Sequence, residues 1–313
     1  MNMHTGRCKT PREEKVVRRQ LSVHLAASCN LACVYCQCPP TGRAMTRAEV
    51  RAALGRTGAG AVCLEGGGEP TISPGLQGWI KFLKARGVKT FMLSTNGVAL
   101  ADMRLARRLA GSVDSFILNL PACDERTYRL ATRSVKFQAA LKGLENLEKL
   151  GAAGKTRLFH IIFRHNYRRL PAFAGWVARH HPDIGFVNFI FMRNVGRAAV
   201  SPEPLLPSYT QAVPYIRTAL AYLKLSGIKA VIQNTPLCVL GRFKGFAFEL
   251  HRWRRGDPVL PPNAAPKAAV PACRRCRLEP ACCGARPDYL AVHGSGELKA
   301  SAVAPGSVKP ENF

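Results

Sequence analysis

The sequence of 313 residues lacks any long apolar run. It opens MNMHTGRCKTPREEKVVRRQ, a charged stretch with no apolar segment of signal-peptide length. No later stretch reaches the roughly 20 apolar residues that a membrane-spanning helix needs. We therefore expect a cytoplasmic protein without a membrane span, in a compartment that keeps thiols reduced.

Acidic residues are also scarce. Asp and Glu number 19 against 46 Lys and Arg, which gives a net charge of +27. A positive field of this kind attracts anions, and RNA is one candidate partner, but a general surface bias is the favoured explanation. The densest basic patch is HRWRRG, where Arg252, Arg254 and Arg255 surround Trp253. It could bind phosphate or lie in a solvated loop.

Cysteine, in contrast, is abundant. The chain has 12, and three of them fall in CNLACVYC. Clustered cysteines in a reducing compartment indicate metal or redox chemistry before disulfides. Thiolates from Cys29, Cys33 and Cys36 can hold three irons of a [4Fe-4S] cluster and leave the fourth iron open. Zinc is the competing metal, and it would need a fourth ligand such as Cys38 or His24.

Short apolar runs alternate with amphipathic stretches from about residue 18 onward. We predict six strands, each followed by a helical stretch, in QLSVHLAA, AVCLEG, VKTFMLSTNG, SVDSFILNL, TRLFHIIF and IGFVNFIF. Six such units in series predict an α/β fold with a parallel sheet. The sheet could be a partial barrel or an open, doubly wound sheet, and the pattern alone does not choose.

The alternation of short apolar runs and amphipathic stretches ends after the sixth predicted strand. A long helix is predicted in SYTQAVPYIRTALAYLKLSG and a further strand in IKAVIQN, and an irregular Pro- and Ala-rich loop follows. We divide the chain into a basic N-terminal segment (1–17), a core (18–205), a cysteine-containing region (206–295) and a flexible tail (296–313).

Polar turns follow the first three predicted strands. The first strand ends in the cysteine loop, the second in EGGGEPT and the third in STNG. Because the carboxyl ends of parallel strands meet at one edge of a sheet, these turns should form one ligand site. Glycines would let the backbone approach a ligand closely, and Glu69 could hold an ammonium group. Ser94 and Asn96 offer polar groups suited to a ribose.

These three motifs resemble those of the radical SAM superfamily. CNLACVYC resembles its C-x3-C-x-aromatic-C signature, and GGGEP and STNG resemble its methionine-binding and ribose-binding turns in the expected order. The resemblance covers roughly residues 18–195. It implies a partial (β/α)6 barrel, similar to part of a TIM barrel. It also implies that the cluster on Cys29, Cys33 and Cys36 binds S-adenosylmethionine (SAM) through its open iron.

The resemblance further implies the residues that surround SAM. They are Tyr35 near the adenine, Gly67, Gly68 and Glu69 at the methionyl ammonium, and Ser94 and Asn96 at the ribose. A reduced cluster would cleave SAM to methionine and a 5′-deoxyadenosyl radical, which abstracts a hydrogen atom from the substrate. The electron would come from an external donor such as a ferredoxin or flavodoxin. In such enzymes the cofactors carry the chemistry, and the protein orients and shields it.

A second cysteine group lies near the C-terminus. Cys273, Cys276 and Cys282 have C-x2-C-x5-C spacing, and Cys238 follows the strand predicted in IKAVIQN. Four thiolates would close a site that could hold zinc or a [4Fe-4S] cluster, and the spacing does not separate these metals. Cys283, beside Cys282, could substitute for it.

The segment CRRCRLEPACCGARPDYLAVHG resembles the C-x2-C-x5-C-x-G-x4-Y pattern of the twitch and SPASM extensions of radical SAM enzymes. Gly284 and Tyr289 fall at the family positions. The resemblance implies one auxiliary [4Fe-4S] cluster, with zinc as the competing metal. Many relatives with such extensions act on ribosomally made peptides.

The sequence therefore favours a radical SAM enzyme that modifies a peptide or protein side chain. The alternatives are a radical SAM enzyme acting on a small metabolite or on RNA, and a non-enzymatic iron-sulfur sensor that binds nucleic acid. The reaction class stays open. Residues that shape substrate choice are expected at the later strand ends, around Asn119, Arg164 and Arg193.

Overall fold

The computed structural model describes residues 20–201, 203–260 and 265–311, so the basic segment 1–17 lies outside the described residues. The described strands form one parallel sheet. They are β1 (Gln20–Val23), β2 (Ala61–Leu64), β3 (Thr90–Thr95), β4 (Ser115–Asn119), β5 (Thr156–Ile162), β6 (Phe186–Phe191) and β7 (Ala230–Gln233). All six predicted strands are confirmed. The strand predicted in IKAVIQN is β7, which pairs with β6 and brings the sheet to seven strands.

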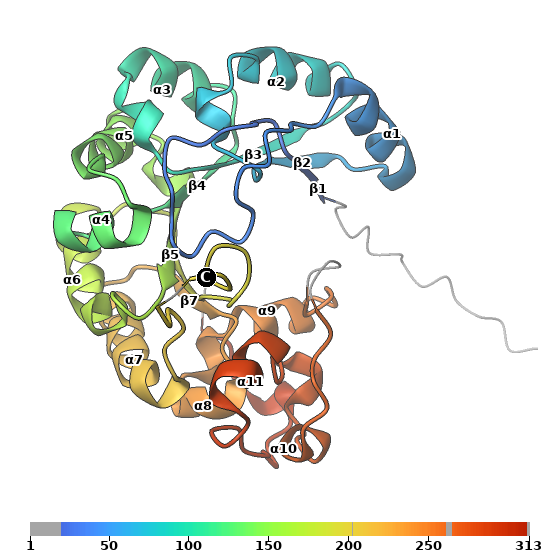
Figure 1. Ribbon diagram of the computed structural model, residues 1–313, viewed down its shortest axis with the longest axis vertical. Helices are drawn as coiled ribbons and strands as arrows, with labels where there is room; N and C mark the ends of the chain where they lie inside the picture. Colours follow the sequence, from blue (N-terminus) through green and yellow to red (C-terminus); the bar gives the residue numbers. More distant parts are fainter. Residues whose placement is uncertain (1–19, 202, 261–264, 312–313) are drawn as a thin grey trace, which may run out of the picture.

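The strands are hydrogen-bonded in sequence order, from β1 to β7. A doubly wound sheet requires a point where the strand order reverses, and this order has none. The topology therefore decides between the two expected architectures in favour of a singly wound sheet. Within the described chain β1 and β7 do not pair with each other, so the sheet stays open instead of closing into a TIM barrel. Figure 1 shows it as a crescent with helices along the outer side.

In the described chain, one α-helix connects each pair of consecutive strands, except that both α4 (Glu125–Thr132) and α5 (Phe137–Lys149) lie between β4 and β5. The others are α1 (Arg47–Thr57), α2 (Leu76–Lys84), α3 (Met103–Ala110), α6 (Leu170–His180) and α7 (Tyr209–Leu225). Four short helices follow β7: α8 (Leu237–Leu240), α9 (Phe248–Arg254), α10 (Pro271–Arg274) and α11 (Pro287–His293). None of the described helices is both long and apolar enough to cross a membrane.

Local sequence explains where α1 begins. Thr46 accepts a hydrogen bond from the Glu49 amide at 3.2 Å, and the Glu49 carboxylate accepts one from the Thr46 amide at 2.8 Å. This reciprocal capping box satisfies two amide groups that the first turn of a helix leaves without partners. It terminates the long loop that carries the first cysteine group.

The larger apolar core continues from β4–β7 into the C-terminal region. Tyr209 of α7 and Tyr289 of α11 stack with ring centroids 3.9 Å apart, and both are buried. The Tyr289 hydroxyl accepts a hydrogen bond from the Tyr209 amide at 2.7 Å. The same core includes Leu278 and Cys282. The cysteine-containing region thus packs directly on the sheet domain.

Residues 296–311, part of the segment that we expected to be a flexible tail, contact the rest of the protein. Glu297 accepts a hydrogen bond from the Thr210 amide at the start of α7. Further along, the Glu311 amide donates to the Gly245 carbonyl at 3.0 Å. Arg254 donates to two carbonyl groups of this segment, so one arginine of the HRWRRG patch has a structural role. The segment lacks the periodicity of a helix or a strand, which suggested a tail, but contacts with distant residues hold it in place.

Candidate functional site

The turn after β2 lies directly against the chain that leads into the cysteine loop. The Glu69 amide donates to the Ser28 carbonyl at 2.9 Å. A Cβ atom on Gly68 would lie 2.3 Å from that carbonyl oxygen and 2.7 Å from the Ala26 carbonyl oxygen. Only glycine allows this approach, because a side chain would collide with backbone that has no freedom to move. The first two turns therefore meet, as predicted.

Glu69 joins the turns after β2 and β3. Its buried carboxylate accepts hydrogen bonds from the Thr71 amide at 3.1 Å, the Thr95 hydroxyl at 2.6 Å and the Asn96 amide at 2.8 Å. Burial raises the pKa of this carboxyl group, and its hydrogen-bond donors counteract the shift. Oε2 receives its hydrogen bond from Asn96 and keeps a lone pair that an ammonium group can use.

Asn96 links the turn after β3 to the cysteine loop. Its side-chain amide nitrogen donates to Asn30 at 2.7 Å and lies 4.0 Å from the Cys29 sulfur. Its side-chain oxygen accepts from the Val98 amide. Ser94 stands on β3 in register with Ile117 of β4. It alternates with Leu93, which is buried in the core beneath the helices, so Ser94 faces the inner side of the crescent.

The three thiols of the cysteine loop are partly buried. Burial raises the pKa of Cys29, Cys33 and Cys36, for Cys33 to about 12. The positive charge of Arg197 opposes this effect at Cys29 and Cys36. Without a metal these thiols therefore favour the protonated form at neutral pH, and metal binding must displace their protons.

Tyr35 lies between the cysteine loop and the end of β4. Its buried hydroxyl hydrogen-bonds to the Cys33 thiol and accepts from the Asn119 side-chain amide at 3.1 Å. The side-chain oxygen of Asn119 is buried without a hydrogen-bond partner among the described residues. An orphaned acceptor on the residue that binds Tyr35 fits a site that is completed by a ligand.

Sequence reasoning missed the loop after β6. The Arg197 amide donates to the Cys36 carbonyl at 3.0 Å. Gly196 has a φ of 61°, and a Cβ atom there would lie 2.4 Å from the same carbonyl oxygen. The available signal was the Gly-Arg pair of NVGR, which follows the sixth strand. Of the two arginines that we considered instead, Arg193 lies near Asp288, and the Arg164 amide donates to the Leu205 carbonyl.

Whether these thiols fit a [4Fe-4S] cluster depends on whether all of them must bind the same metal atom. Among the described residues, no three His, Cys, Asp or Glu side chains are placed to hold one metal ion together. A [4Fe-4S] cluster distributes its thiolates over separate irons, so its ligands need not converge on a single point. Three thiols on one loop are a donor set that fits such a cluster.

The second group of cysteines lines one cavity. Its walls include all four predicted ligands, Cys238, Cys273, Cys276 and Cys282. The space within it that a water-sized sphere can enter is only about 20 Å³. The thiols come from α8, from α10 and from the two loops that follow α10. Folding thus brings Cys238 together with three cysteines that lie 35 or more positions later in the chain.

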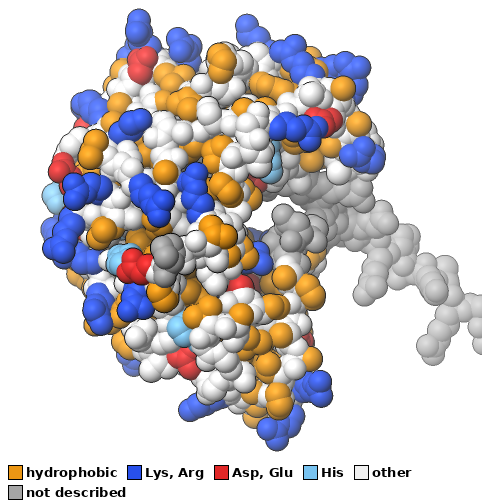
Figure 2. Space-filling view, in the orientation of Figure 1, with side chains coloured by type: hydrophobic (Ala, Val, Ile, Leu, Met, Phe, Trp, Pro, Cys, Tyr) orange, Lys and Arg blue, Asp and Glu red, His pale blue; other side chains and the backbone are white. Residues whose placement is uncertain are grey.

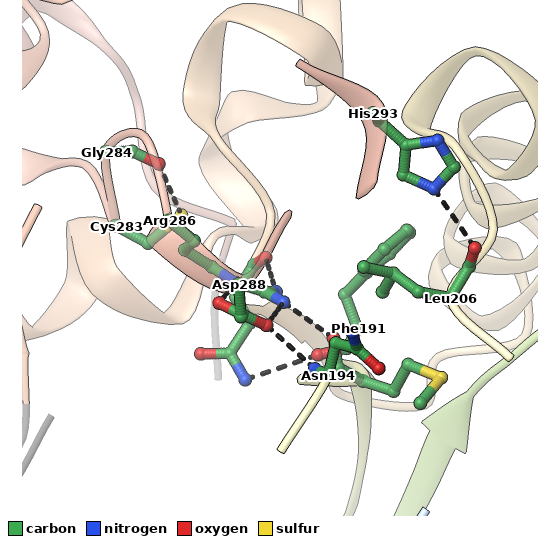
Figure 3. Close-up of polar contacts among 10 residues, drawn as sticks. Phe191, Asn194, Leu206, Cys283, Gly284, Arg286, Asp288 and His293 are labelled. Carbon is green, nitrogen blue, oxygen red and sulfur yellow. Dashed lines mark hydrogen bonds and ion pairs between the residues drawn. The ribbon is translucent and has the colours of Figure 1, made fainter. Parts of the chain in front are cut away.

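The sulfur atoms of Cys282 and its neighbour Cys283 have different surroundings. The Cys282 sulfur accepts backbone amide hydrogen bonds from Leu237 and Gly284, each at 3.3 Å. A hydrogen bond from Cys283, together with these amides, lowers the pKa of Cys282 to about 7 despite burial. The Cys283 sulfur lies 3.8 Å from the Gly284 carbonyl oxygen (Figure 3), and Cys283 is not among the residues that line the cavity. Cys282 is therefore the better candidate ligand.

A buried ion pair fastens this region to the ends of β6 and β7 (Figure 3). Arg286 and Asp288 are joined at 2.7 Å. Arg286 also donates to the Met192 and Asn234 carbonyls, and Asp288 accepts from the Asn194 amide at 2.8 Å. The two cysteine groups are therefore both attached to the carboxyl edge of the sheet.

Comparison with known proteins agrees with this geometry. Residues 23–177 match the model of the radical SAM superfamily. A GTP 3′,8-cyclase of Chlorobaculum tepidum is 27% identical over 174 residues, which cover 53% of this chain and 52% of the relative. The chain thus spans about half the length of this curated relative. The residues around the first cysteine group form a radical SAM domain.

Solved structures share the fold. Streptococcus suis SuiB bound to the precursor peptide SuiA matches with a TM-score of 0.56 at 14% identity, over 72% of this chain and 50% of that chain. Native anSMEcpe with bound S-adenosylmethionine and the Kp18Cys peptide matches with a TM-score of 0.55 at 17% identity, over 76% and 67%. These likenesses show the fold of the sheet domain. The likeness of its C-terminal region to a twitch or SPASM extension stays a prediction.

Proposed function

We propose that this enzyme cleaves SAM reductively and uses the resulting radical to modify a peptide or protein side chain. An auxiliary [4Fe-4S] cluster on the second cysteine group would assist the reaction. The observation that carries the proposal is the cavity lined by Cys238, Cys273, Cys276 and Cys282, at the same edge of the sheet as the three-thiol loop. The two structural neighbours with bound peptides support the substrate class.

The cofactors supply the radical chemistry. When bound and reduced, a [4Fe-4S] cluster provides the electron that splits SAM into methionine and a 5′-deoxyadenosyl radical. Cys29, Cys33 and Cys36 would hold three of its irons and leave one for the amino and carboxylate groups of SAM. An external electron donor such as a ferredoxin or flavodoxin would reduce it.

The polar turns would position SAM. Gly67 and Gly68 let the backbone approach the methionyl group, and Glu69 offers its remaining lone pair to the ammonium. Ser94 faces the inner side of the sheet, where a ribose could lie. Asn96 and Tyr35 would act mainly by holding the cysteine loop, because their side chains already bind Asn30 and Cys33.

The second site would be closed by its own four thiols. A fully ligated cluster does not bind SAM, so its role would be to accept an electron during the reaction or to support the substrate site. Zinc would make the same site purely structural. Metal content separates these outcomes.

A purine nucleotide is the second candidate substrate. The relative from Chlorobaculum tepidum is a GTP 3′,8-cyclase, and the net charge of +27 suits an anionic substrate. The similarity covers about half of each chain, so it does not extend over the whole relative.

The test compares the two substrate classes directly. Anaerobically reconstituted enzyme is reduced with dithionite and supplied with SAM plus either the Kp18Cys peptide or GTP. We expect 5′-deoxyadenosine formation to rise with the peptide, and a change in the peptide's mass. A rise with GTP alone would favour the nucleotide. Absence of 5′-deoxyadenosine under every condition would contradict SAM cleavage itself.

A further inference from the structure

A basic surface adjoins the cysteine loop on the outer side of the sheet. We call it the α4–α5 surface and define it by Arg126, Arg129, Arg133, Val135 and Lys136. A hollow of about 520 Å³ has walls from Arg129, Arg133 and Lys136 on one side and from the loop residues 29–32 on the other. A second hollow of about 380 Å³ shares Arg129 and Val135 and adds Arg126. Figure 2 shows Lys and Arg side chains gathered over this part of the molecule.

Two exposed apolar side chains accompany the basic ones. Val135, which lines both hollows, is 82% exposed, and Leu130 on α4 is 45% exposed. Exposed apolar side chains among charged ones are compatible with a protein docking site. The acid that lines the hollows is Glu125, whose carboxylate accepts a hydrogen bond from Gln138. The net charge of the patch is therefore strongly positive.

The α4–α5 surface is fixed to the backbone between the thiols. The Ala32 amide donates to the Thr132 carbonyl at 3.0 Å, and the Val34 amide donates to the Ala131 carbonyl at 2.9 Å. Lys136 donates to the Asn30 carbonyl at 3.3 Å. The carbonyl groups at the end of α4 thus hold the loop that carries Cys29 and Cys33. Cys29 itself lines the hollow, so a protein seated here would lie beside one of the three thiols.

A partner bound at the α4–α5 surface would lie on a different side of the sheet from the substrate. A substrate of the radical must reach the inner side of the crescent, where Ser94 faces, whereas α4 and α5 lie along the outer side (Figure 1). A partner that needs the cysteine loop but not the inner side is one that exchanges electrons with the loop's metal. Its surface must be acidic to complement this patch. Electron-transfer encounters of this kind use small interfaces, below about 1,200 Å².

We propose that the α4–α5 surface docks an acidic one-electron donor protein of the flavodoxin or ferredoxin class. The donor loses one electron, the cluster on Cys29, Cys33 and Cys36 gains it, and no bond or proton changes in this step. The inference rests on the proposed function, because it requires a reducible cluster on that loop.

The test reverses charge on the surface without touching the loop contacts. The variant is Arg126→Glu with Arg129→Glu, both exposed on α4. The matched control is Arg107→Glu with Arg108→Glu, both exposed on α3 and equal in charge change. Each holoenzyme, with its iron content verified, is mixed anaerobically with reduced flavodoxin at low ionic strength. The rate constant for cluster reduction is measured by stopped-flow absorbance.

We expect the α4 variant to be reduced about 10- to 100-fold more slowly than wild type, since complementary charge raises association rates by such factors. The α3 control should match wild type within about twofold, and dithionite should support equal SAM cleavage in all three proteins. Unchanged reduction of the α4 variant, or equal slowing of the control, would overturn the proposal. Loss of peptide turnover with dithionite would also overturn it, by making the patch a substrate surface. If dithionite elicits no SAM cleavage in wild type, the proposed function fails first.

Discussion

The two cysteine groups of this protein are built differently. The N-terminal group offers three thiols on one loop, and the turns after β2, β3 and β6 hold that loop from several sides. The C-terminal group offers four thiols around one narrow cavity, with Cys282 buried and bonded to two backbone amides. Three ligands leave a cluster open to a further molecule, and four ligands close it. The difference predicts that one site performs chemistry on SAM and the other assists.

The largest effect should come from removing one ligand of each group. Cys33→Ala deletes a thiol of the open site, and Cys276→Ala deletes one of the closed site. We expect the first change to lower dithionite-driven 5′-deoxyadenosine formation by more than about 100-fold, beyond the losses that outer-shell changes cause. The second should preserve SAM cleavage within a few-fold and abolish peptide modification. Equal loss of SAM cleavage in both variants would contradict the division of roles.

The neighbouring thiols Cys282 and Cys283 sharpen the comparison within the closed site. Cys282 lines the cavity, whereas the Cys283 sulfur lies 3.8 Å from the Gly284 carbonyl oxygen. After reconstitution, Cys282→Ser should lose about four irons per chain, the content of one [4Fe-4S] cluster. Cys283→Ser should keep them. Iron analysis of both variants checks this, and the reverse result would make Cys283 the ligand.

A change in backbone packing tests the open site. A Cβ atom on Gly68 would lie 2.3 Å from the Ser28 carbonyl oxygen, whereas one on Gly60 would meet no atom within 4 Å. We expect Gly68→Ala to lower the free energy of unfolding by about 1–3 kcal/mol, as overpacking does, and to weaken SAM binding. Gly60→Ala is the matched control and should change stability by less than about 0.5 kcal/mol. Denaturant unfolding measures both, and equal effects would refute the close approach.

The last prediction concerns the sheet that carries both groups. His160 on β5 is fully buried, and burial lowers its pKa from 6.5 to about 3, although Nδ1 bonds to the Leu120 carbonyl. Below pH 6.5 the unfolded chain binds a proton at this residue and the folded chain does not. Stability should therefore fall as pH decreases, by about 1.4 kcal/mol per pH unit between pH 6 and 4.

The variant His160→Asn can keep a donor near Leu120 but cannot titrate. Its unfolding free energy should depend less on pH than that of wild type in the same range. Urea unfolding at several pH values compares the two slopes. Parallel slopes would mean that His160 does not cause the acid sensitivity.

Local pattern was enough to predict the strands and the three polar turns. The strands appear as short apolar runs, and Cys29, Glu69 and Asn96 each fall just after one, so their meeting follows from parallel topology. The capping of α1 by Thr46 and Glu49 is also visible in the sequence. In these places the information lies within a few residues of the feature it specifies.

Contacts between distant residues could not be predicted in this way. No local signal shows that Arg286 and Asp288 bind the ends of β6 and β7, or that Arg197 meets the Cys36 carbonyl. The docked segment around Glu297 was mistaken for a flexible tail, because its order comes from α7 rather than from its own periodicity. Periodicity also could not distinguish a singly wound sheet from a doubly wound one, since both use the same strand-helix alternation.

The most direct test of the central claim is the metal content of each cysteine group. Iron, labile sulfide and zinc are measured per chain after anaerobic reconstitution, in wild type and in a variant with Cys29, Cys33 and Cys36 changed to Ala. We predict about eight irons in wild type and about four in the variant, one [4Fe-4S] cluster for each group. A variant that holds no iron but retains one zinc ion would contradict this account, because the closed site would then be structural.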